Sequence, residues 1–222
     1  ERHTFTYCKP LIMEASQPPR ELNRLDTQNW HPTPPALQDQ LANAVRKLAP
    51  QVDAMIVLDQ VDVPETGVVT KNLLRTIDEI REQTLVIGDS RRGLKDWPHI
   101  VYKMNTTELA QLTGQVSNSP ESSALTLSKQ TGQQVFVTLA EGGIVGTTPD
   151  GTTAHCPTLP VRGEIDIVGA GDAVTANLAT GLAGGAELSE TLALANVAAS
   201  VVIHKLGTTG TATVEEMRET LG

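Results

Sequence analysis

The 222 residues carry a net charge of −9, with 39% hydrophobic but only 3% aromatic residues. This composition argues against a nucleic-acid surface, which needs basic patches and stacking rings. No run of about 18 apolar residues occurs, so no membrane-spanning segment is expected. The length predicts one domain over residues 1–222, and the missing initiator Met suggests a fragment or a processed chain. Two widely separated cysteines, Cys8 and Cys156, fit a reducing cytoplasm better than a disulfide scaffold.

The first part of the chain predicts a strand and a helix. Residues 4–14 alternate weakly between apolar and polar, until the prolines of residues 17–20 interrupt the pattern. After Pro34 and Pro35, which a first helical turn tolerates, the spacing from Leu37 to Leu48 gives one apolar helical face.

Two continuous apolar runs, residues 54–59 and 85–89, each end in an aspartate. Such runs are typical of parallel strands that are buried on both faces. Between them, residues 68–81 have the apolar spacing of a helix. Strand, helix and strand with a polar residue at each strand end indicate a doubly wound α/β sheet, whose ligands bind at the carboxyl ends of the strands.

The same alternation continues toward the C-terminus. A strand over residues 100–104 leads into a helix over 105–114, which has an Asn cap, a Glu three residues later and a terminal glycine. The turn at 141–143 is expected to reverse the chain. The remaining predicted elements are a helix over 120–131, strands over 134–139 and 152–157, and helices over 188–204 and 214–221.

The stretch Asp166-Ile167-Val168-Gly169-Ala170-Gly171-Asp172 opens an apolar helix. Its glycines let the backbone approach a ligand closely, and the positive end of the helix dipole favours an anion. An aspartate repels a bound phosphate, so phosphate binding by itself does not explain Asp172. A general base beside the phosphate does explain it. The stretch therefore indicates phosphoryl transfer to a hydroxyl. The structural alternative is a tight turn between helix and sheet, with Asp172 as an N-terminal helix charge.

This stretch resembles the C-terminal signature of the ribokinase (PfkB-type) sugar kinases, and three further stretches match that family in order. Residues 103–108 resemble its Asn-x-x-Glu element, residues 138–143 its Thr-Leu-Gly-x-x-Gly turn with Ala140 in place of glycine, and residues 195–200 its small-residue helix at the adenine pocket. Taken singly, they also fit a capping box, a hairpin turn and close helix packing. The resemblance implies a ribokinase-like three-layer α/β/α fold with a mostly parallel sheet. The family's N-terminal portion, with its Gly-Gly signature and β lid, is expected to be absent.

The resemblance also implies roles for individual residues. Asp172 is expected to be the general base, with Gly169, Ala170 and Gly171 donating N–H groups to the transferred group. The residues expected to bind ATP are Asn105, Glu108, Thr138, Leu139, Ala140, Glu141, Gly143 and Asn196. Magnesium is expected to be held through water by Glu108, and a monovalent cation such as K⁺, which many members bind, at Asp166, Val168, Gly207 and Thr211. Asp166 has a structural alternative, as a strand-end residue that hydrogen-bonds the glycine-rich turn.

Within the family, the nearest likeness is to the heptose-phosphate kinase domains of ADP-heptose synthesis proteins. Residues 24–26 resemble their Arg-x-Asp, and residues 89–92 resemble their Asp-Pro-Lys, so that Arg91 or Arg92 is either a phosphate ligand or a solvated charge. Asp59 aligns with their Asp-Tyr-Gly-Lys-Gly, but the Gly-Lys-Gly is lost.

The expected function is ATP-dependent phosphorylation of a sugar or sugar phosphate in the cytoplasm, with a heptose phosphate as the first candidate. The alternatives are a kinase for a nucleoside or a vitamin, and a nucleotide-binding or regulatory module without kinase activity. Members of the family often dimerise through the lid. Because the lid is expected to be absent here, both a monomer and a homodimer are possible.

Overall fold

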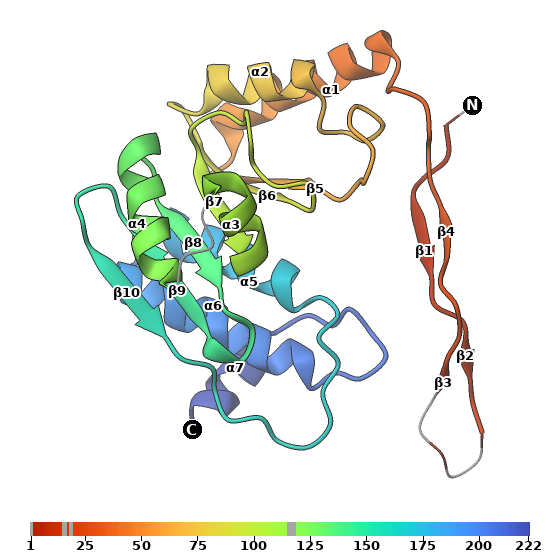
Figure 1. The fold of residues 1–222 in the computed structure, drawn as a ribbon, viewed down its shortest axis with the longest axis vertical. Helices are drawn as coiled ribbons and strands as arrows, with labels where there is room; N and C mark the ends of the chain where they lie inside the picture. The colour runs from red at the N-terminus through yellow and green to blue at the C-terminus, as the bar shows by residue number, and fades with distance from the viewer. Residues whose placement is uncertain (1, 15–16, 18–19, 115–118) are drawn as a thin grey trace.

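The computed structural model describes residues 2–14, 17, 20–114 and 119–222. Its centre is a six-stranded sheet in the order β10-β9-β8-β7-β6-β5 (Figure 1). Four strands run parallel: β5 (Ala54–Asp59), β6 (Leu85–Ser90), β7 (Val101–Asn105) and β8 (Val135–Thr138). β9 (Ile144–Thr147) and β10 (Thr153–Cys156) extend the sheet in antiparallel fashion. The predicted mostly parallel sheet and the predicted reversal after residue 143 are confirmed.

Helices cover both faces of this sheet (Figure 1). One apolar cluster joins the sheet to α1 (Pro35–Leu48), α2 (Lys71–Ile80), α3 (Thr106–Thr113) and α4 (Pro120–Thr131). A second cluster on the other face joins it to α5 (Ala170–Ala183) and α6 (Leu188–Ile203). The short α7 (Val214–Leu221) packs on α6 through Met217. The three-layer α/β/α arrangement expected from the sequence is therefore present.

The side chains of β8 show why helices must pack on both faces of the sheet. Val135 and Val137 enter the cluster under α1–α4, whereas Phe136 enters the cluster under α5 and α6. All three side chains are fully buried, and burying a side chain of this size contributes about 1.5–3 kcal/mol. The continuous apolar runs in the sequence thus reflect alternation between two buried faces.

Helix ends follow local capping. α2 begins at Lys71, three residues after the predicted start, because the Thr70 side chain accepts a hydrogen bond from the Leu73 N–H and caps the helix there. The boundaries of α4 agree with the prediction. α6 ends at Ile203 and has His204 as its C-cap. These shifts are small and leave the order of elements as predicted.

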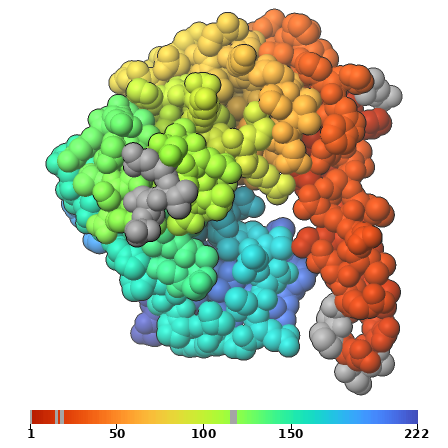
Figure 2. All heavy atoms as spheres, viewed as in Figure 1, coloured from red at the N-terminus to blue at the C-terminus, as the bar shows by residue number. Residues whose placement is uncertain are grey.

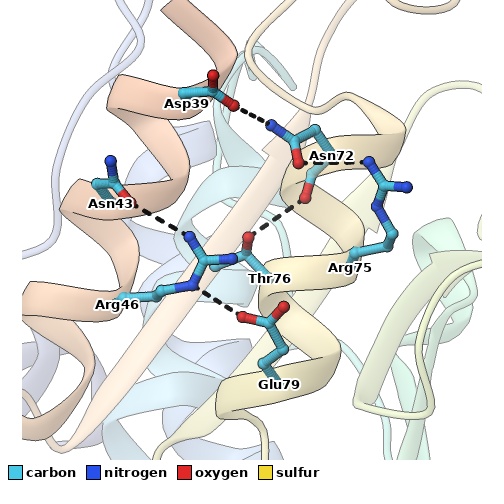
Figure 3. Close-up of polar contacts among 7 residues, drawn as sticks. All are labelled: Asp39, Asn43, Arg46, Asn72, Arg75, Thr76 and Glu79. Carbon is cyan, nitrogen blue, oxygen red and sulfur yellow. Dashed lines mark hydrogen bonds and ion pairs between the residues drawn. The ribbon is translucent and has the colours of Figure 1, made fainter.

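Polar side chains join α1 to α2 on the outer surface (Figure 3). Arg46 of α1 bonds Glu79 of α2 at 2.8 Å, and the Asn72 amide donates to Asp39 at 3.0 Å. The Arg46 guanidinium lowers the pKa of Glu79. Such exposed pairs contribute little to stability, so the two helices are held mainly by their apolar faces.

The N-terminal segment forms a two-stranded ribbon apart from the main sheet. β1 (Thr6–Cys8) pairs with β4 (Leu25–Thr27), and β2 (Leu11–Ile12) pairs with β3 (Arg20–Glu21), both antiparallel. The ribbon stands off as an arm, with an open gap between its far end and the body (Figures 1 and 2). The predicted strand over 4–14 is thus two short strands, and the returning strands were not predicted. Residues 18 and 19 of the predicted break lie outside the described residues.

Candidate active site

The parallel strands bring polar residues to one edge of the sheet. Asp59, Asp89, Asn105 and Thr138 lie at or next to the carboxyl ends of β5, β6, β7 and β8. The carboxyl ends of parallel strands are where doubly wound sheets bind ligands. The order of the strands therefore brings residues from separate sequence motifs to one edge of the sheet.

Helix α5 begins at this edge with a tight turn. Gly169 is its N-cap with a φ of 86°, a conformation that favours glycine, and a Cβ there would lie 3.3 Å from the Thr209 backbone. Asp172 stands exposed in the first turn. Its carboxylate has no hydrogen-bond or ion-pair partner within the described part of the chain. It is therefore free to accept a proton from a bound molecule.

The backbone amides of the turn are not all available. The Ala170 N–H donates to the Ile167 carbonyl at 3.2 Å, which closes the turn. The amides of Gly169 and Gly171 have no acceptor among residues that the structure describes. Together with the positive end of α5, these two amides favour an anion. The predicted role of Ala170 as a third donor requires the turn to open.

A buried lysine lies beside this turn. The Lys103 ammonium in β7 is 2.7 Å from the Asp89 carboxylate, and a Cβ on Gly171 would be 3.3 Å from it. The Thr175 hydroxyl of α5 donates to the same Asp89 oxygen at 3.1 Å. These contacts tie β6, β7 and α5 together and place the ion pair of Lys103 and Asp89 beside the turn that opens α5. Sequence analysis gave Lys103 no role; its signal was a lysine inside an otherwise apolar strand.

Asn105 and Glu108 form a capping box at the start of α3. Asn105 Oδ1 accepts from the Glu108 N–H at 2.9 Å, and Glu108 Oε2 accepts from the Asn105 N–H at 2.7 Å. The structural alternative for this motif is thus present. Burial raises the pKa of Glu108, and the nearby Asp89 carboxylate raises it further.

The carboxylates of Glu108 and Asp89 suit a divalent cation. Mg²⁺ is usually bound by one or two carboxylates, water and substrate phosphates. A cation beside Glu108 would stabilise its charged form, which burial disfavours most and the Asp89 carboxylate disfavours further. Among the described residues, no cluster of three or more His, Cys, Asp or Glu side chains forms a closed metal site. The residues present therefore fit a magnesium ion that arrives with a phosphate ligand.

The turn between β8 and β9 is built on two unusual backbone conformations. Ala140 has a φ of 51°, although alanine rarely adopts positive values. Gly143 has a φ of 94°, and a Cβ there would lie 2.0 Å from the Cys156 carbonyl oxygen. Hydrogen bonds from Leu139 N to the Gly143 carbonyl at 2.8 Å and from Gly142 N to the Leu139 carbonyl at 2.9 Å close the turn. The turn is thus held rigidly against β10.

A pocket of about 540 Å³ joins these elements, a volume within the usual range for small-molecule sites. Eight of the predicted residues line it: Asn105, Thr138, Ala140, Glu141, Gly143, Ala170, Gly171 and Asn196. Its outer wall includes Leu159, Val161, Ile165 and Ile167. Sequence analysis gave this wall no role, because the segment has no regular periodicity. The amide of Asn196 points at this segment and donates to the Pro157 carbonyl at 2.6 Å.

Other predicted residues lie around the pocket. Asp172, Glu108, Leu139 and Gly169 do not line it, and neither do Asp166, Val168, Gly207 and Thr211. Asp166 accepts from Val168 N at 3.0 Å and from Gly207 N at 3.2 Å, as its structural alternative requires. The Thr211 carbonyl accepts from the Lys205 ammonium. The monovalent-cation assignment stays a prediction.

A second group of charges lies where the ribbon meets the sheet edge. The buried Asp59 carboxylate pairs with Arg92 at 2.5 Å, so the partly accessible Arg92 guanidinium already has a partner within the protein. The guanidinium groups of Arg24 and Arg91 lie 5.0 Å and 5.4 Å from the centre of the Tyr7 ring. Arg24 also pairs with Asp26 at 2.6 Å. Arg91 is exposed and makes no ion pair within the described ranges.

No helix among the described residues is long and apolar enough to cross a membrane. Comparison with known proteins finds relatives that are named bifunctional protein HldE. Bifunctional protein HldE of Paramagnetospirillum magneticum is 32% identical over 193 residues, which cover 85% of this chain and 39% of that protein. HldE of Syntrophotalea carbinolica is 28% identical and covers 97% of this chain and 44% of that protein. The chain thus spans less than half the length of these curated relatives.

Solved structures show the same fold. A phosphofructokinase-2 variant from Escherichia coli matches with a TM-score of 0.71 at 18% identity, over 89% of this chain and 65% of that chain. Ribokinase from Arabidopsis thaliana matches with a TM-score of 0.68 at 18% identity, over 96% of this chain and 70% of that chain. The fold is therefore ribokinase-like. A model of the pfkB family of carbohydrate kinases matches residues 87–215, and the chain belongs to that family.

Proposed function

We propose that this chain is the nucleotide-binding and catalytic part of an ATP-dependent kinase that phosphorylates a hydroxyl of a sugar or sugar phosphate. The observation that carries the proposal is Asp172, which is exposed and unpartnered within the described residues at the start of α5, two residues after a pocket-lining turn. Ribokinase, one of the structural neighbours, is described with ribose and ATP. A carboxylate in this place fits a base that serves a hydroxyl beside a phosphate.

The residues of the chain divide the chemistry between them. Asp172 takes the proton of the acceptor hydroxyl as the hydroxyl oxygen attacks the terminal phosphorus of ATP, while the bond from that phosphorus to the bridging oxygen breaks and ADP leaves. The amides of Gly169 and Gly171 donate to the charge that develops on the transferred group, and one such donor is typically worth about 3 kcal/mol. Lys103 adds a positive charge on the same side. When Mg²⁺ is bound, Glu108 and Asp89 would hold it through water, and it would neutralise phosphate charge.

The nucleotide fits the pocket beside α5. Thr138, Ala140 and Gly143 are positioned to contact its phosphates. Asn196 and the apolar side chains of Leu159 and Val161 offer an apolar surface for the adenine ring. On the acceptor side, Arg91 is exposed and close to the carboxyl end of β6. A guanidinium suits a phosphate group, which favours a phosphorylated acceptor such as a heptose phosphate over a nucleoside or a vitamin.

The test is phosphoryl transfer from MgATP by the full-length protein across a panel of sugars and sugar phosphates, heptose 7-phosphate included. Asp172→Asn should lower kcat by at least about 100-fold and leave ATP affinity nearly unchanged, because the amide cannot accept the proton. Equal turnover in the variant would remove the base assignment. ATP binding without transfer to any acceptor would instead support a nucleotide-binding or regulatory module, which the strained Ala140 and the lost Gly-Lys-Gly near Asp59 favour.

A further inference from the structure

The outer wall of the pocket is a segment without helix or strand, residues 157–167. It contributes Leu159, Val161, Ile165 and Ile167 to the pocket lining. Val161, Ile165 and Ile167 are also among the exposed apolar side chains of the molecule. Leu159 packs against the apolar cluster of α6 and α7. Since the other three side chains are exposed, the placement of the segment beyond Leu159 depends on the hydrogen bonds that tie it to its neighbours.

Three hydrogen bonds attach this wall to α6 and its C-cap. At one end, the Asn196 amide donates to the Pro157 carbonyl at 2.6 Å. At the other end, the Asp166 N–H donates to the Ile203 carbonyl at 2.8 Å. Between them, the Arg162 N–H donates to Nε2 of His204 at 3.0 Å. The middle attachment is the only one of the three that uses a titratable side chain.

The two ring nitrogens of His204 have fixed and opposite roles. Nδ1 lies 2.6 Å from the Ser200 carbonyl, which can only accept, so Nδ1 carries the hydrogen. Nε2 must then accept from the Arg162 N–H with its lone pair. A protonated imidazole carries hydrogen on both nitrogens, so protonation replaces this hydrogen bond with two facing N–H groups.

We infer that His204 is a positioning residue: its neutral ring holds the 157–167 wall against the nucleotide pocket, and its protonation releases the wall and weakens nucleotide binding. The inference rests on the proposed nucleotide site. Histidine is the side chain that ordinarily changes charge between about pH 5 and about pH 8, so the tether responds within the range where enzymes work.

Several charged and titratable groups lie on the elements around His204. Lys205, the next residue, pairs with Glu216 of α7 at 2.6 Å. Asp166 uses both carboxylate oxygens on the amides of Val168 and Gly207. On the wall, the side chains of Arg162 and Glu164 are exposed.

The first test needs no nucleotide. Hydrogen exchange at the Arg162 amide of the full-length protein is measured between about pH 5 and about pH 8 and corrected for the intrinsic rate. In the native sequence, protection should fall about three- to tenfold toward acidic pH, the value of one net hydrogen bond. His204→Gln keeps an acceptor that does not titrate, so its protection should stay flat. Flat protection in the native sequence, or an equal fall in the variant, would overturn the inference.

The second test measures the Kd of MgATP over the same pH range in three proteins. His155→Gln is the matched control, because His155 lies 2.7 Å from the Gly142 carbonyl through Nε2, a donated bond that a protonated ring keeps. The native protein and His155→Gln should lose severalfold more affinity at acidic pH than His204→Gln, since ATP itself titrates equally in all three. The reverse ranking contradicts the inference. Absence of MgATP binding at every pH would contradict the proposed function instead, while amide exchange still decides the tether.

Discussion

Ala140 has a strained backbone, because its Cβ is unfavourable at a positive φ. Its φ of 51° costs an alanine about 1–2 kcal/mol, and a glycine at this position would avoid that cost while losing roughly 0.5–1 kcal/mol in chain entropy. Ala140→Gly should therefore raise the free energy of unfolding by about 0.5 kcal/mol. Denaturant unfolding of the two proteins measures this difference. A less stable variant would show that the methyl group makes a contact that outweighs the strain.

Gly143 lies in the same turn, and its substitution is expected to change the free energy of unfolding in the opposite direction. A Cβ at this position would meet the Cys156 carbonyl oxygen at 2.0 Å, and the clash is with backbone that cannot rotate away. Gly143→Ala should therefore lower the free energy of unfolding by roughly 3 kcal/mol, from positive φ and overpacking together. A Gly143→Ala protein as stable as the native chain would contradict the close approach of Gly143 to the Cys156 carbonyl.

Single residues were predictable from sequence where their role is local. The capping box of Asn105 and Glu108 needs only the residues between them, and the structure has it. The ion pair of Lys103 with Asp89 joins two strands, so it depends on the strand order that brings them together. The same holds for His204, whose partner Arg162 is 42 residues away. Such contacts leave no pattern in a single sequence.

Elements were predictable where hydrophobic period and caps agree. α1, α4 and β5 have the expected positions, because each combines a clear apolar pattern with a turn or proline at its start. The ribbon was only partly predicted, since its strands have two or three residues each and lie mostly exposed, which leaves no hydrophobic alternation. The segment 157–167 has no hydrophobic periodicity, so its position follows only from its contacts with neighbouring elements.

Helix α7 gives a prediction at the scale of an element. Glu216 accepts from Lys205 and from the Thr213 N–H, and these bonds lower its pKa from 4.5 to about 2. A lowered carboxylate pKa adds stability that is complete above about pH 4.5 and is lost as the pH falls toward about 2. Glu216→Gln should therefore be less stable than the native chain at neutral pH, and the difference should shrink within that window.

Thermal unfolding of both proteins between about pH 7 and about pH 2 checks this expectation. Glu215→Gln is the matched control, because Glu215 precedes Glu216 on α7 and has no ion pair in the described segments. It should follow the native curve at every pH. A difference between Glu216→Gln and the native chain that stays constant down to about pH 2 would mean that the carboxylate charge does not hold α7 in place.

At the scale of the whole molecule, the chain consists of a well-packed body and a weakly attached ribbon. The body has apolar clusters on both faces of its sheet. The ribbon has exposed strands, and Figure 2 shows it standing away from the body along much of its length. One attachment is Tyr7, whose hydroxyl donates to the Gln60 carbonyl at 3.1 Å and whose ring contacts Arg91.

This contrast predicts unequal opening within the 222-residue chain. An isolated two-stranded ribbon is marginally stable in water, whereas buried strands open only with global unfolding. Amides of β1 and β4 should therefore exchange with solvent at least about 100-fold faster than those of β7 and β8. Tyr7→Phe removes only the hydroxyl bond, and Tyr7→Ala also removes the ring contact, so exchange in β1 should rise in that order while β8 stays unchanged. Equal protection of ribbon and body would mean that the ribbon belongs to the cooperative core.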